Sequence, residues 1–543
     1  MIKEKWWKKS VVYQIYPRSF CDSNGDGIGD INGIRSKLWY LKELGIDIIW
    51  LSPVYSSPNA DNGYDISDYC GISPEYGTMD EMKALIDECE NCGIKIMMDL
   101  VVNHTSDEHP WFIEAKQSKD NPYREYYIWR KGEKGNPPNQ LESCFGGSAW
   151  EYSEETKEYY LHFFHKKQPD LNWENQAVRK EVWKIMNYWI DMGIGGFRMD
   201  VIDMIGKVPD KEIKENGPRL HEYLQEMNRE TFGEKNLVTV GECWGADIEK
   251  GRLYSDPERK ELDMIFQFEQ MLLDQVPGKS KWDLKPLELK QLKQVFAKWQ
   301  DALEGKGWNS LFWNNHDLPR IVSRWGNDKE YRVESAKMLA TILHGMKGTP
   351  YIYQGEEIGM TNCPLLSVED LADVESRNMY YERKQMGYKE EDIMNSISTK
   401  ARDNARTPMQ WNDGYEAGFT EGTPWYRVNP NYMEINAKKA LEDKDSIFYY
   451  YKELIHLRKK EPILIYGNFK LLYSEDKSVF AYIREWDYKK WLIVCNFYGT
   501  PTDFMYPARG QVILSNYKQE PVILLENISL RPYEAIICEL IET

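Results

Sequence analysis

Eight short runs of apolar and β-branched residues recur along the chain, separated by segments with helical periodicity. They span residues 11–16, 47–51, 95–102, 194–200, 237–242, 264–268, 310–314 and 350–354. Strands that are apolar on both faces and alternate with helices are typical of parallel sheets. Eight such units predict an α/β fold, namely a (β/α)8 TIM barrel.

The spacing of these runs predicts two further units. The stretch between the third and fourth runs is far longer than one crossover helix needs, so residues 104–175 are expected to form an inserted subdomain. An irregular stretch over residues 355–422 should lie over the same rim. After residue 466 the pattern changes to short strands and turns, which predicts a C-terminal antiparallel β-sandwich over 467–543. The barrel then comprises 1–103 and 176–466.

Four of the runs end in ionisable residues. These are Asp99 with His104, Arg198 with Asp200, Glu242, and His316 with Asp317. A carboxylate at the end of an apolar strand is costly unless it has a partner or a chemical role. Because the carboxyl ends of parallel strands meet at one rim of a barrel, the four segments predict an active site there. The other interpretation is a set of structural ion pairs.

These residue types favour glycoside hydrolysis, which needs one carboxylate as nucleophile and another as acid/base. Arg198 lies two residues before Asp200, so on a strand both side chains point the same way. The guanidinium should keep Asp200 ionised. Glu242, on another strand, is expected in a less polar niche where it retains its proton. Neither a Ser–His nor a Cys–His arrangement for acyl transfer appears, nor does a glycine-rich phosphate loop.

Composition narrows the function classes. The 543 residues carry a net charge of −18, which argues against nucleic acid or anionic membranes as partners. No stretch approaches the ~18 apolar residues of a membrane span. Nine dispersed cysteines in so large a chain indicate free thiols, so we expect a cytoplasmic protein, and we expect a monomer. The 20 Trp and 36 Tyr suit stacking on sugar rings, although a large core uses many of them.

The four segments resemble the four signature regions of the α-amylase superfamily (glycoside hydrolase family 13), and the similarity covers nearly the whole chain. Within it, the chain is similar to the branch of oligo-1,6-glucosidases and dextran glucosidases. The resemblance implies that Asp200 is the nucleophile, Glu242 the acid/base and Asp317 the carboxylate that stabilises the transition state. It also implies that the bond is cleaved with retention of configuration, and that three residues hold the sugar in subsite −1: His104, Arg198 and His316.

Two further matches imply an exo-acting enzyme. Asp61 and Tyr64 resemble the pair that lines the closed end of subsite −1. Arg402 resembles the arginine that joins Asp61 in gripping the terminal glucose, with Arg406, one helical turn away, as the alternative. A loop salt bridge is the other interpretation of Arg402. A pocket closed in this way admits one terminal glucose.

The residues beside the signature segments bear on the type of bond. Val201 follows the nucleophile and resembles relatives that cut α-1,6 bonds, whereas those that cut α-1,4 bonds usually have Thr or Ala there. Trp244, two residues beyond Glu242, is placed to stack on a glucose in subsite +1 or beyond. Ordinary packing is the other interpretation of both side chains.

An Asp- and Gly-rich loop follows the first run and predicts a calcium site. The expected ligands are the side chains of Asp22, Asn24, Asp26 and Asp30 and the carbonyl of Ile28. These hard oxygen donors suit Ca²⁺. The loop begins like an EF-hand, but its twelfth position is Gly33 rather than Glu, so we expect a loop site with a structural role, similar to one in this family. A turn without metal is the alternative.

The sequence therefore predicts a retaining, exo-acting α-glucosidase that hydrolyses α-1,6 bonds at the non-reducing ends of isomalto-oligosaccharides or dextran fragments. Alternatives in the family are trehalose-6-phosphate hydrolase, α-1,4-glucosidase and sucrose isomerase. The first needs a basic subsite +1. No Lys/Arg cluster flanks the signature segments, although loops folded there from elsewhere can supply one. A different class is a non-catalytic carbohydrate-binding or transporter-partner protein.

Overall fold

The computed structural model describes residues 5–541, and its centre is a barrel of eight parallel strands. These are β1 (Val12–Ile15), β2 (Ile48–Leu51), β5 (Lys95–Leu100), β9 (Gly196–Met199), β10 (Val238–Glu242), β11 (Met264–Phe266), β12 (Ser310–Leu311) and β13 (Thr349–Tyr353). They run in the order β11-β10-β9-β5-β2-β1-β13-β12. A parallel bridge between Ile265 and Asn309 joins the two ends. Each predicted run overlaps one of these strands, so the barrel prediction is confirmed.

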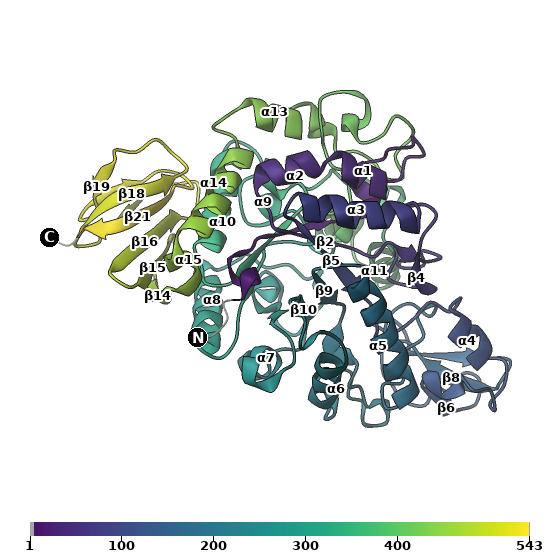
Figure 1. Cartoon of the computed structure of the whole chain (residues 1–543). Coiled ribbons are helices and arrows are strands. Elements are labelled where there is room, and N and C mark those ends of the chain that lie inside the picture. Colours follow the sequence, from purple (N-terminus) through teal and green to yellow (C-terminus); the bar gives the residue numbers. More distant parts are fainter. Residues whose placement is uncertain (1–4, 542–543) are drawn as a thin grey trace.

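Helices surround the barrel (Figure 1). They are α1 (Ile31–Ser36), α2 (Leu38–Leu44), α3 (Met79–Asn91), α5 (Gln176–Asp191), α6 (Leu220–Met227), α7 (Ile248–Ser255), α8 (Leu289–Leu303), α9 (Ile321–Arg324), α10 (Arg332–His344), α13 (Ala437–Glu442), α14 (Ile447–Lys460) and α15 (Pro462–Tyr466). Local sequence sets their ends: Thr78 and Glu81 form a capping box at the start of α3. Gly45, with φ of 94°, ends α2 in a conformation that glycine adopts without strain.

The chain between β5 and α5 forms a small separate sheet beside the barrel. It contains α4 (Pro110–Ala115) and three antiparallel strands, β6 (Trp129–Lys131), β7 (Trp150–Ser153) and β8 (Glu158–Leu161), in the order β6-β8-β7. Before it, β3 (Tyr55–Ser56) and β4 (Asp68–Ile72) form a hairpin. A buried ion pair of 2.8 Å between Asp170 and Lys207 ties the inserted segment to the loop after β9. Val201 and Met204 of that loop also pack into its apolar cluster.

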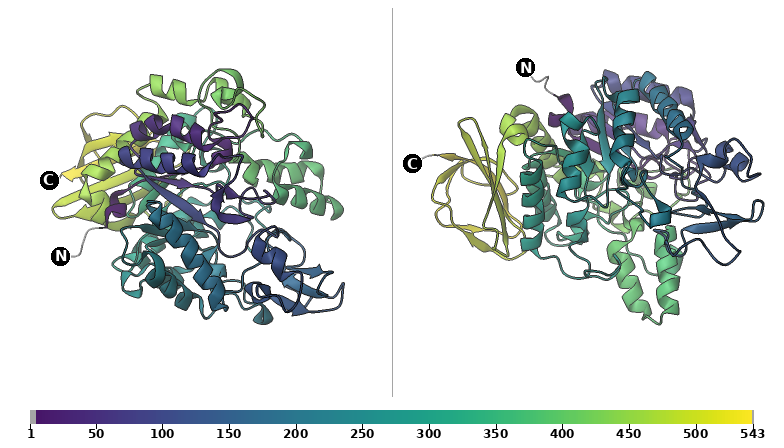
Figure 2. Two further views of the ribbon diagram at one scale, coloured as in Figure 1. Left: turned by 45° about the vertical axis from the view of Figure 1, so that its right-hand side comes forward. Right: turned by 90° about the horizontal axis from the view of Figure 1, so that it is seen from below.

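The stretch after β13 is not irregular throughout, so this part of the sequence interpretation is wrong. It contains a helical hairpin, α11 (Val374–Gln385) and α12 (Glu390–Lys400). Met379 of α11 and Ile393 and Ile397 of α12 form its apolar cluster. The hairpin and the inserted segment both project from the side of the barrel away from the C-terminal sheets (Figure 2, left). Two separate segments thus lie over one rim.

The C-terminal part is a six-stranded antiparallel sheet facing a two-stranded one. The larger sheet has the order β14 (Asn468–Leu472), β15 (Val479–Trp486), β16 (Lys489–Asn496), β21 (Ala535–Ile541), β18 (Arg509–Ser515) and β19 (Val522–Leu524), and β17 (Thr502–Phe504) pairs with β20 (Ile528–Leu530). The sandwich packs against the barrel through α8. There the ammonium of Lys293 donates to the carbonyls of Tyr473, Asp476 and Val479 at 2.6–2.9 Å. This buried cation ties the β14–β15 turn to the barrel.

All nine cysteines lie within the described residues, and each is a free thiol. Within residues 5–541, no helix has the length and apolar character needed to cross a membrane.

Candidate active site

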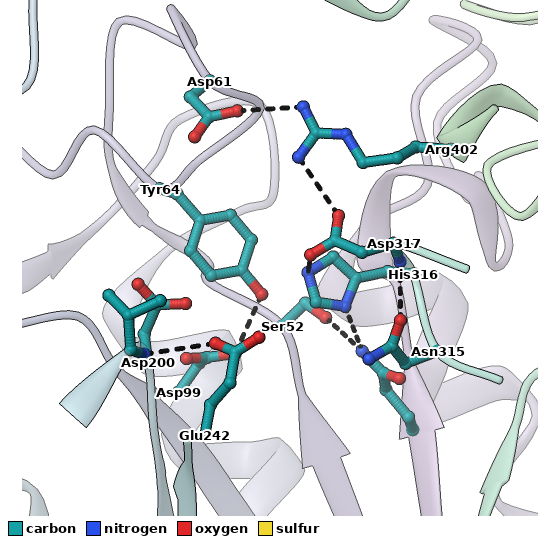
Figure 3. A network of polar contacts seen from close by, with 12 residues as sticks. Ser52, Asp61, Tyr64, Asp99, Asp200, Glu242, Asn315, His316, Asp317 and Arg402 are labelled. Atoms are coloured by element: carbon teal, nitrogen blue, oxygen red, sulfur yellow. Dashed lines mark hydrogen bonds and ion pairs between the residues drawn. The ribbon is translucent and has the colours of Figure 1, made fainter. Parts of the chain in front are cut away.

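A cavity of about 340 Å³ opens at the rim where the barrel strands end. Its walls contain nine of the predicted residues, namely Asp61, Tyr64, His104, Asp200, Val201, Glu242, Trp244, Asp317 and Arg402. Arg198 and His316, each 1% exposed, contact these residues from beneath. The structure therefore brings all the predicted catalytic and sugar-binding residues together, and Figure 3 shows many of them.

Arg198 joins the carboxylates of three neighbouring strands. Its Nη1 donates to Asp99 Oδ1 and Asp200 Oδ1, both at 2.8 Å, and its Nη2 donates to Glu242 Oε2 at 2.5 Å. Burial raises the pKa of Asp200 well above its ordinary value; Arg198 opposes this, and the nearby Glu242 adds to it. Burial thus outweighs the guanidinium at this carboxyl group, which departs from the expectation that Arg198 keeps Asp200 ionised. Arg198 still supplies the counter-charge that an anionic nucleophile requires.

The surroundings of Glu242 are more polar than expected. Besides Arg198, the backbone N–H of Val201 donates to Oε2 at 3.1 Å, and Trp244 Nε1 donates to Oε1 at 3.0 Å. The expectation of a less polar niche is therefore wrong, because it considered only the residue's own strand. Hydrogen bonds from the two neighbouring loops fix the direction of this carboxyl group.

Val201 has an unusual backbone, with φ of 34° and ψ of 45°. A β-branched residue is strained in this left-handed region, and such strain persists where surrounding structure enforces it. Here the conformation directs the Val201 N–H at Glu242, while the side chain lines the cavity and also packs against the inserted segment. The side chain therefore packs, and it also lines the cavity, where its bearing on the type of bond stays a prediction.

Trp244 is 41% exposed at the cavity wall. One face of its ring stacks on Phe268, with centroids 3.8 Å apart and planes 7° apart. An exposed indole held flat in this way is a suitable platform for a sugar ring.

Asp317 is held by cations on one side and by His316 on the other. Its Oδ1 accepts from Arg402 Nη1 at 3.2 Å and from Arg406 Nη2 at 2.8 Å, and His316 Nε2 lies 3.3 Å from Oδ2. Burial acts to raise the pKa of Asp317, but these neighbours outweigh it and hold the pKa well below its usual range. Burial also lowers the pKa of His316 to about 3. Asp317 is therefore an anion next to a neutral imidazole.

One end of the cavity is closed by Asp61 and Arg402, whose Oδ1 and Nη2 are 3.6 Å apart. Both arginines considered from the sequence contact Asp317, but Arg402 is the one paired with Asp61. Tyr64 lies between these groups and the base of the site: its hydroxyl donates to Asp99 Oδ2 at 3.0 Å, and its ring stacks on His316. The closed end is thus built by the loops after β2 and β13.

Known protein families match this chain over both the barrel and the C-terminal sheets. Residues 14–467 match the catalytic domain family of α-amylases, and residues 469–537 match the C-terminal domain family of maltogenic amylases. The chain belongs to the α-amylase family. It is 57% identical to the oligo-1,6-glucosidase of Parageobacillus thermoglucosidasius, with 98% of each chain covered. It is 55% identical to the glucan 1,6-alpha-glucosidase of Streptococcus pneumoniae, with 99% of this chain and all of the relative covered.

A solved structure of a mutant trehalose-6-phosphate hydrolase from Bacillus licheniformis superimposes with a TM-score of 0.95 at 48% identity, covering 99% of this chain and all of that one. The predictions of family and of a glycoside hydrolase are therefore confirmed. Several members of one family with different substrates share this fold, so the substrate has to be inferred from the cavity walls.

Several residues of this α-amylase-family site were given no role in it by sequence reasoning, although Gln168 begins a segment, residues 168–172, that resembles a further signature of the branch. Gln14 Nε2 lies 2.8 Å from His316 Nδ1, and Gln168 Nε2 lies 3.0 Å from His104 Nε2. Asp373, at the start of α11, pairs with both Arg402 and Arg406. Gln14 had a detectable signal, since it is a polar residue inside an otherwise apolar strand. Asp373 had none, because the helix that presents it was not predicted.

Successive hydrogen bonds from backbone N–H groups to side-chain oxygens coil the predicted metal loop. Asp22 Oδ1 accepts from the backbone N–H of Asn24, Asn24 Oδ1 from that of Asp26, and Asp26 Oδ1 from that of Ile28. Asp30 instead caps α1 through Gly33 and accepts from Ser23. Within residues 5–541, no group of three or more His, Cys, Asp or Glu side chains converges as a metal site. Besides carboxylates, the predicted ligand set includes the amide oxygen of Asn24 and the carbonyl of Ile28. All of these ligand atoms are oxygens, which fits the chemistry of Ca²⁺.

Proposed function

We propose that the protein is a retaining, exo-acting α-glucosidase that releases glucose from the non-reducing ends of α-1,6-linked oligosaccharides such as isomalto-oligosaccharides or dextran fragments. The observation that carries this proposal is the arrangement of Asp200 and Glu242 on one guanidinium, beside an anionic Asp317, in a cavity closed at one end. The printed names of the relatives at 55–57% identity support the α-1,6 bond.

The proposed reaction has two balanced steps. Asp200 attacks the anomeric carbon while Glu242 gives its proton to the glycosidic oxygen, so the C–O bond breaks and a glucosyl ester forms. Water then gives a proton to Glu242 and attacks the same carbon, and Asp200 leaves as a carboxylate. Asp317 stabilises the positive charge that develops on the sugar ring. Two inversions at one carbon retain the α configuration.

The closed end supports exo action. The guanidinium of Arg402 offers hydrogen-bond donors and the carboxylate of Asp61 offers acceptors, and the two groups are 3.6 Å apart. This arrangement suits two neighbouring hydroxyls of a terminal glucose. Phe145 packs over the guanidinium of Arg402 at 5.2 Å from its ring centre. A further glucose unit on that side has no room, so the chain end sets the position of cleavage.

The charges of the cavity wall favour a neutral substrate over a phosphorylated one. Loops do bring basic residues to the wall, and most of them are ion-paired. Lys281 contacts Glu375 at 2.5 Å, Arg324 and Lys400 share Asp274, and Lys214, which donates to the carbonyl of Glu142, has no carboxylate partner among residues 5–541. A phosphate group would have to compete with Glu375 or Asp274 for three of these four cations. We therefore do not favour trehalose 6-phosphate as the substrate.

A substrate panel tests the proposal. Glucose release is measured in parallel from isomaltose, panose, dextran, maltose, sucrose and trehalose 6-phosphate. Isomaltose and panose should react with the highest kcat/KM, and the glucose formed first should be the α anomer by NMR. Faster hydrolysis of trehalose 6-phosphate, conversion of sucrose to isomers, or binding without turnover would each overturn the proposal in favour of a named alternative.

Val201→Thr should raise the kcat/KM for maltose relative to isomaltose by roughly tenfold, the low end of what one side-chain change in a substrate pocket achieves. Threonine has the same branched shape as valine, so the strained backbone is kept while a methyl group becomes a hydroxyl. Val208→Thr, seven residues on and outside the cavity wall, is the matched control. An unchanged ratio in Val201→Thr would leave the residue with a packing role alone.

We further propose that the loop around Asp22 binds one Ca²⁺ with a structural role, through the ligands predicted from the sequence. Partial burial acts to raise the pKa of Asp22, but hydrogen bonds from Thr420 and the loop backbone lower it overall, so this carboxylate is anionic. A bound cation stabilises the folded state by mass action.

Chelation should lower the melting temperature by several degrees, roughly what a loss of 1–2 kcal/mol produces, and added Ca²⁺ should restore it. Differential scanning calorimetry measures this shift, and metal analysis after mild dialysis measures the stoichiometry. In Asp26→Asn, chelation should have a smaller effect. A protein that holds no divalent ion and melts at the same temperature with and without chelator would remove the calcium proposal.

We also propose that the protein is a cytoplasmic monomer and that it takes neither nucleic acid nor membrane as a partner. Nine free thiols are compatible with a reducing compartment. The net charge of −18 disfavours polyanionic partners. Light scattering of the purified protein tests the monomer.

A further inference from the structure

A second cavity, of about 320 Å³, lies at the other end of the barrel. Thr239 and Asp263 line it at the amino ends of β10 and β11, whereas Glu242 stands at the carboxyl end of β10. With a rise of about 3.3 Å per residue along a strand, the two sites are roughly 10 Å apart along β10 alone. The 3₁₀ turn Trp6–Lys9 contributes Trp7 and Lys8 to its wall. This cavity is therefore separate from the active site.

The basal cavity is rich in cations, although the chain as a whole is acidic. Lys5, Lys8, Lys235 and Lys260 line it. Lys5 lies 3.9 Å from Asp263. Within residues 5–541, the ammonium groups of the other three form neither a hydrogen bond nor an ion pair with a carboxylate. In a chain with a net charge of −18, three such lysines around one cavity are unusual.

Lys8 is held over aromatic rings instead of beside a carboxylate. Its Nζ lies 4.6 Å from the ring centre of Trp308 and 5.8 Å from that of Trp7. The two indoles meet edge to face at 5.9 Å. A cation–π contact positions an ammonium group but leaves its full charge available to a further ligand. Partial burial lowers the pKa of Lys8 and the nearby Lys347 adds to this, while Asp263 and Glu304 oppose it from a distance.

Trp7 forms part of the aromatic wall of the cavity. Its side chain is 3% exposed and lines the cavity. Its Nε1–H has no hydrogen-bond partner, but this atom is itself buried, so a ligand in the open part of the cavity cannot reach it while the 3₁₀ turn keeps its place. The ring therefore helps to position Lys8 and offers no donor to a ligand.

The carboxylates of the wall are mostly engaged. Glu261 accepts from His221, Gln225 and Arg259. Asp263 Oδ2 accepts from Thr239, while its Oδ1 lies 3.9 Å from Lys5. Glu234 lies at the exposed mouth. Lys8, Lys235 and Lys260 are therefore the charged groups of the wall that remain available to an anion.

We infer that the basal cavity binds a small anion with several acidic oxygens, such as a phosphate ester or a polycarboxylate. Lysine ammonium groups suit these oxygens as point charges. The aromatic walls formed by Trp7, Trp308 and Phe232 leave room for a compact ligand, not for a polymer.

Isothermal titration calorimetry on the full chain tests this inference, with pyrophosphate as the phosphate probe, citrate as the carboxylate probe and glucose as the neutral control. We expect saturable 1:1 binding of at least one anion, weakening as salt is added. Lys8→Gln should weaken it by roughly tenfold or more, because a charge-assisted contact is lost.

Matched controls keep the result interpretable. Lys490→Gln, on β16 of the C-terminal sheet, should bind like the unmodified chain, and Lys8→Gln should hydrolyse isomaltose at an unchanged rate. If Lys8→Gln does not fold, the double variant Lys235→Gln/Lys260→Gln at the exposed mouth gives the same test. Absence of saturable binding by either anion, or unchanged affinity in the cavity variants, would overturn the inference.

Discussion

Asp200→Asn is expected to lower the kcat/KM for isomaltose by roughly 10⁴-fold or more, the scale seen when a covalent nucleophile is removed. Asparagine has nearly the same shape and can still accept from Arg198 Nη1, which lies 2.8 Å from Asp200. The loss should therefore reflect the missing negative charge and not a collapsed site. Steady-state glucose release measures it, and the melting temperature shows whether the fold is intact.

Asp210→Asn is the matched control, because Asp210 belongs to the same loop but pairs with Arg130 on the exposed surface. Its activity should stay within a factor of two of the unmodified chain, as surface changes usually have small effects. A small anionic nucleophile offers a second check: azide added to Asp200→Gly should yield β-glucosyl azide, since it attacks from the vacated side. If Asp200→Asn keeps substantial activity, another residue is the nucleophile.

Glu242→Gln should produce a loss that depends on the leaving group. For isomaltose, whose sugar leaving group needs a proton, we expect a decrease in kcat/KM of roughly 10²–10⁴-fold, the usual contribution of general acid catalysis. For p-nitrophenyl α-glucoside, whose phenolate leaves without a proton donor, the rate of the first step should decrease far less. The second step still lacks its base, so the glucosyl enzyme should accumulate. Rapid mixing should show a burst of about one nitrophenolate per site.

Glu249→Gln on α7 is the control for this variant, since Glu249 is exposed and pairs only with Arg252. It should show neither a burst nor a change in rate. Equal losses for both substrates in Glu242→Gln would contradict the acid/base assignment, because a proton donor must matter more for the poorer leaving group.

Much of this architecture is encoded locally and was predictable. Buried strands such as Lys95–Leu100 are continuous apolar runs, and their ends carry the polar residues of the rim. The contact between Arg198 and Asp200 follows from the two-residue period of a strand. The pairing of Arg402 with Asp61 came from a resemblance to a family, since no local rule brings together residues so far apart in the chain.

What could not be predicted depends on contacts between loops. The polar environment of Glu242 is created by the N–H of Val201 and the indole of Trp244, and neither direction can be derived from one strand alone. The helices α11 and α12 were missed because their apolar positions are few and pack into a small separate cluster with Trp282, Leu365 and Leu371. The segment is polar enough to be mistaken for a loop.

The closed end of the cavity also has a consequence for folding kinetics. Asp61 follows the second barrel strand and Arg402 follows the eighth, and β1 pairs with β13 to bring these ends of the barrel together. The glucose pocket therefore cannot exist in a partly folded barrel, however complete its first half. During refolding from denaturant, glucose release should return only with the slowest phase that closes the ring. Secondary structure measured by circular dichroism should return earlier.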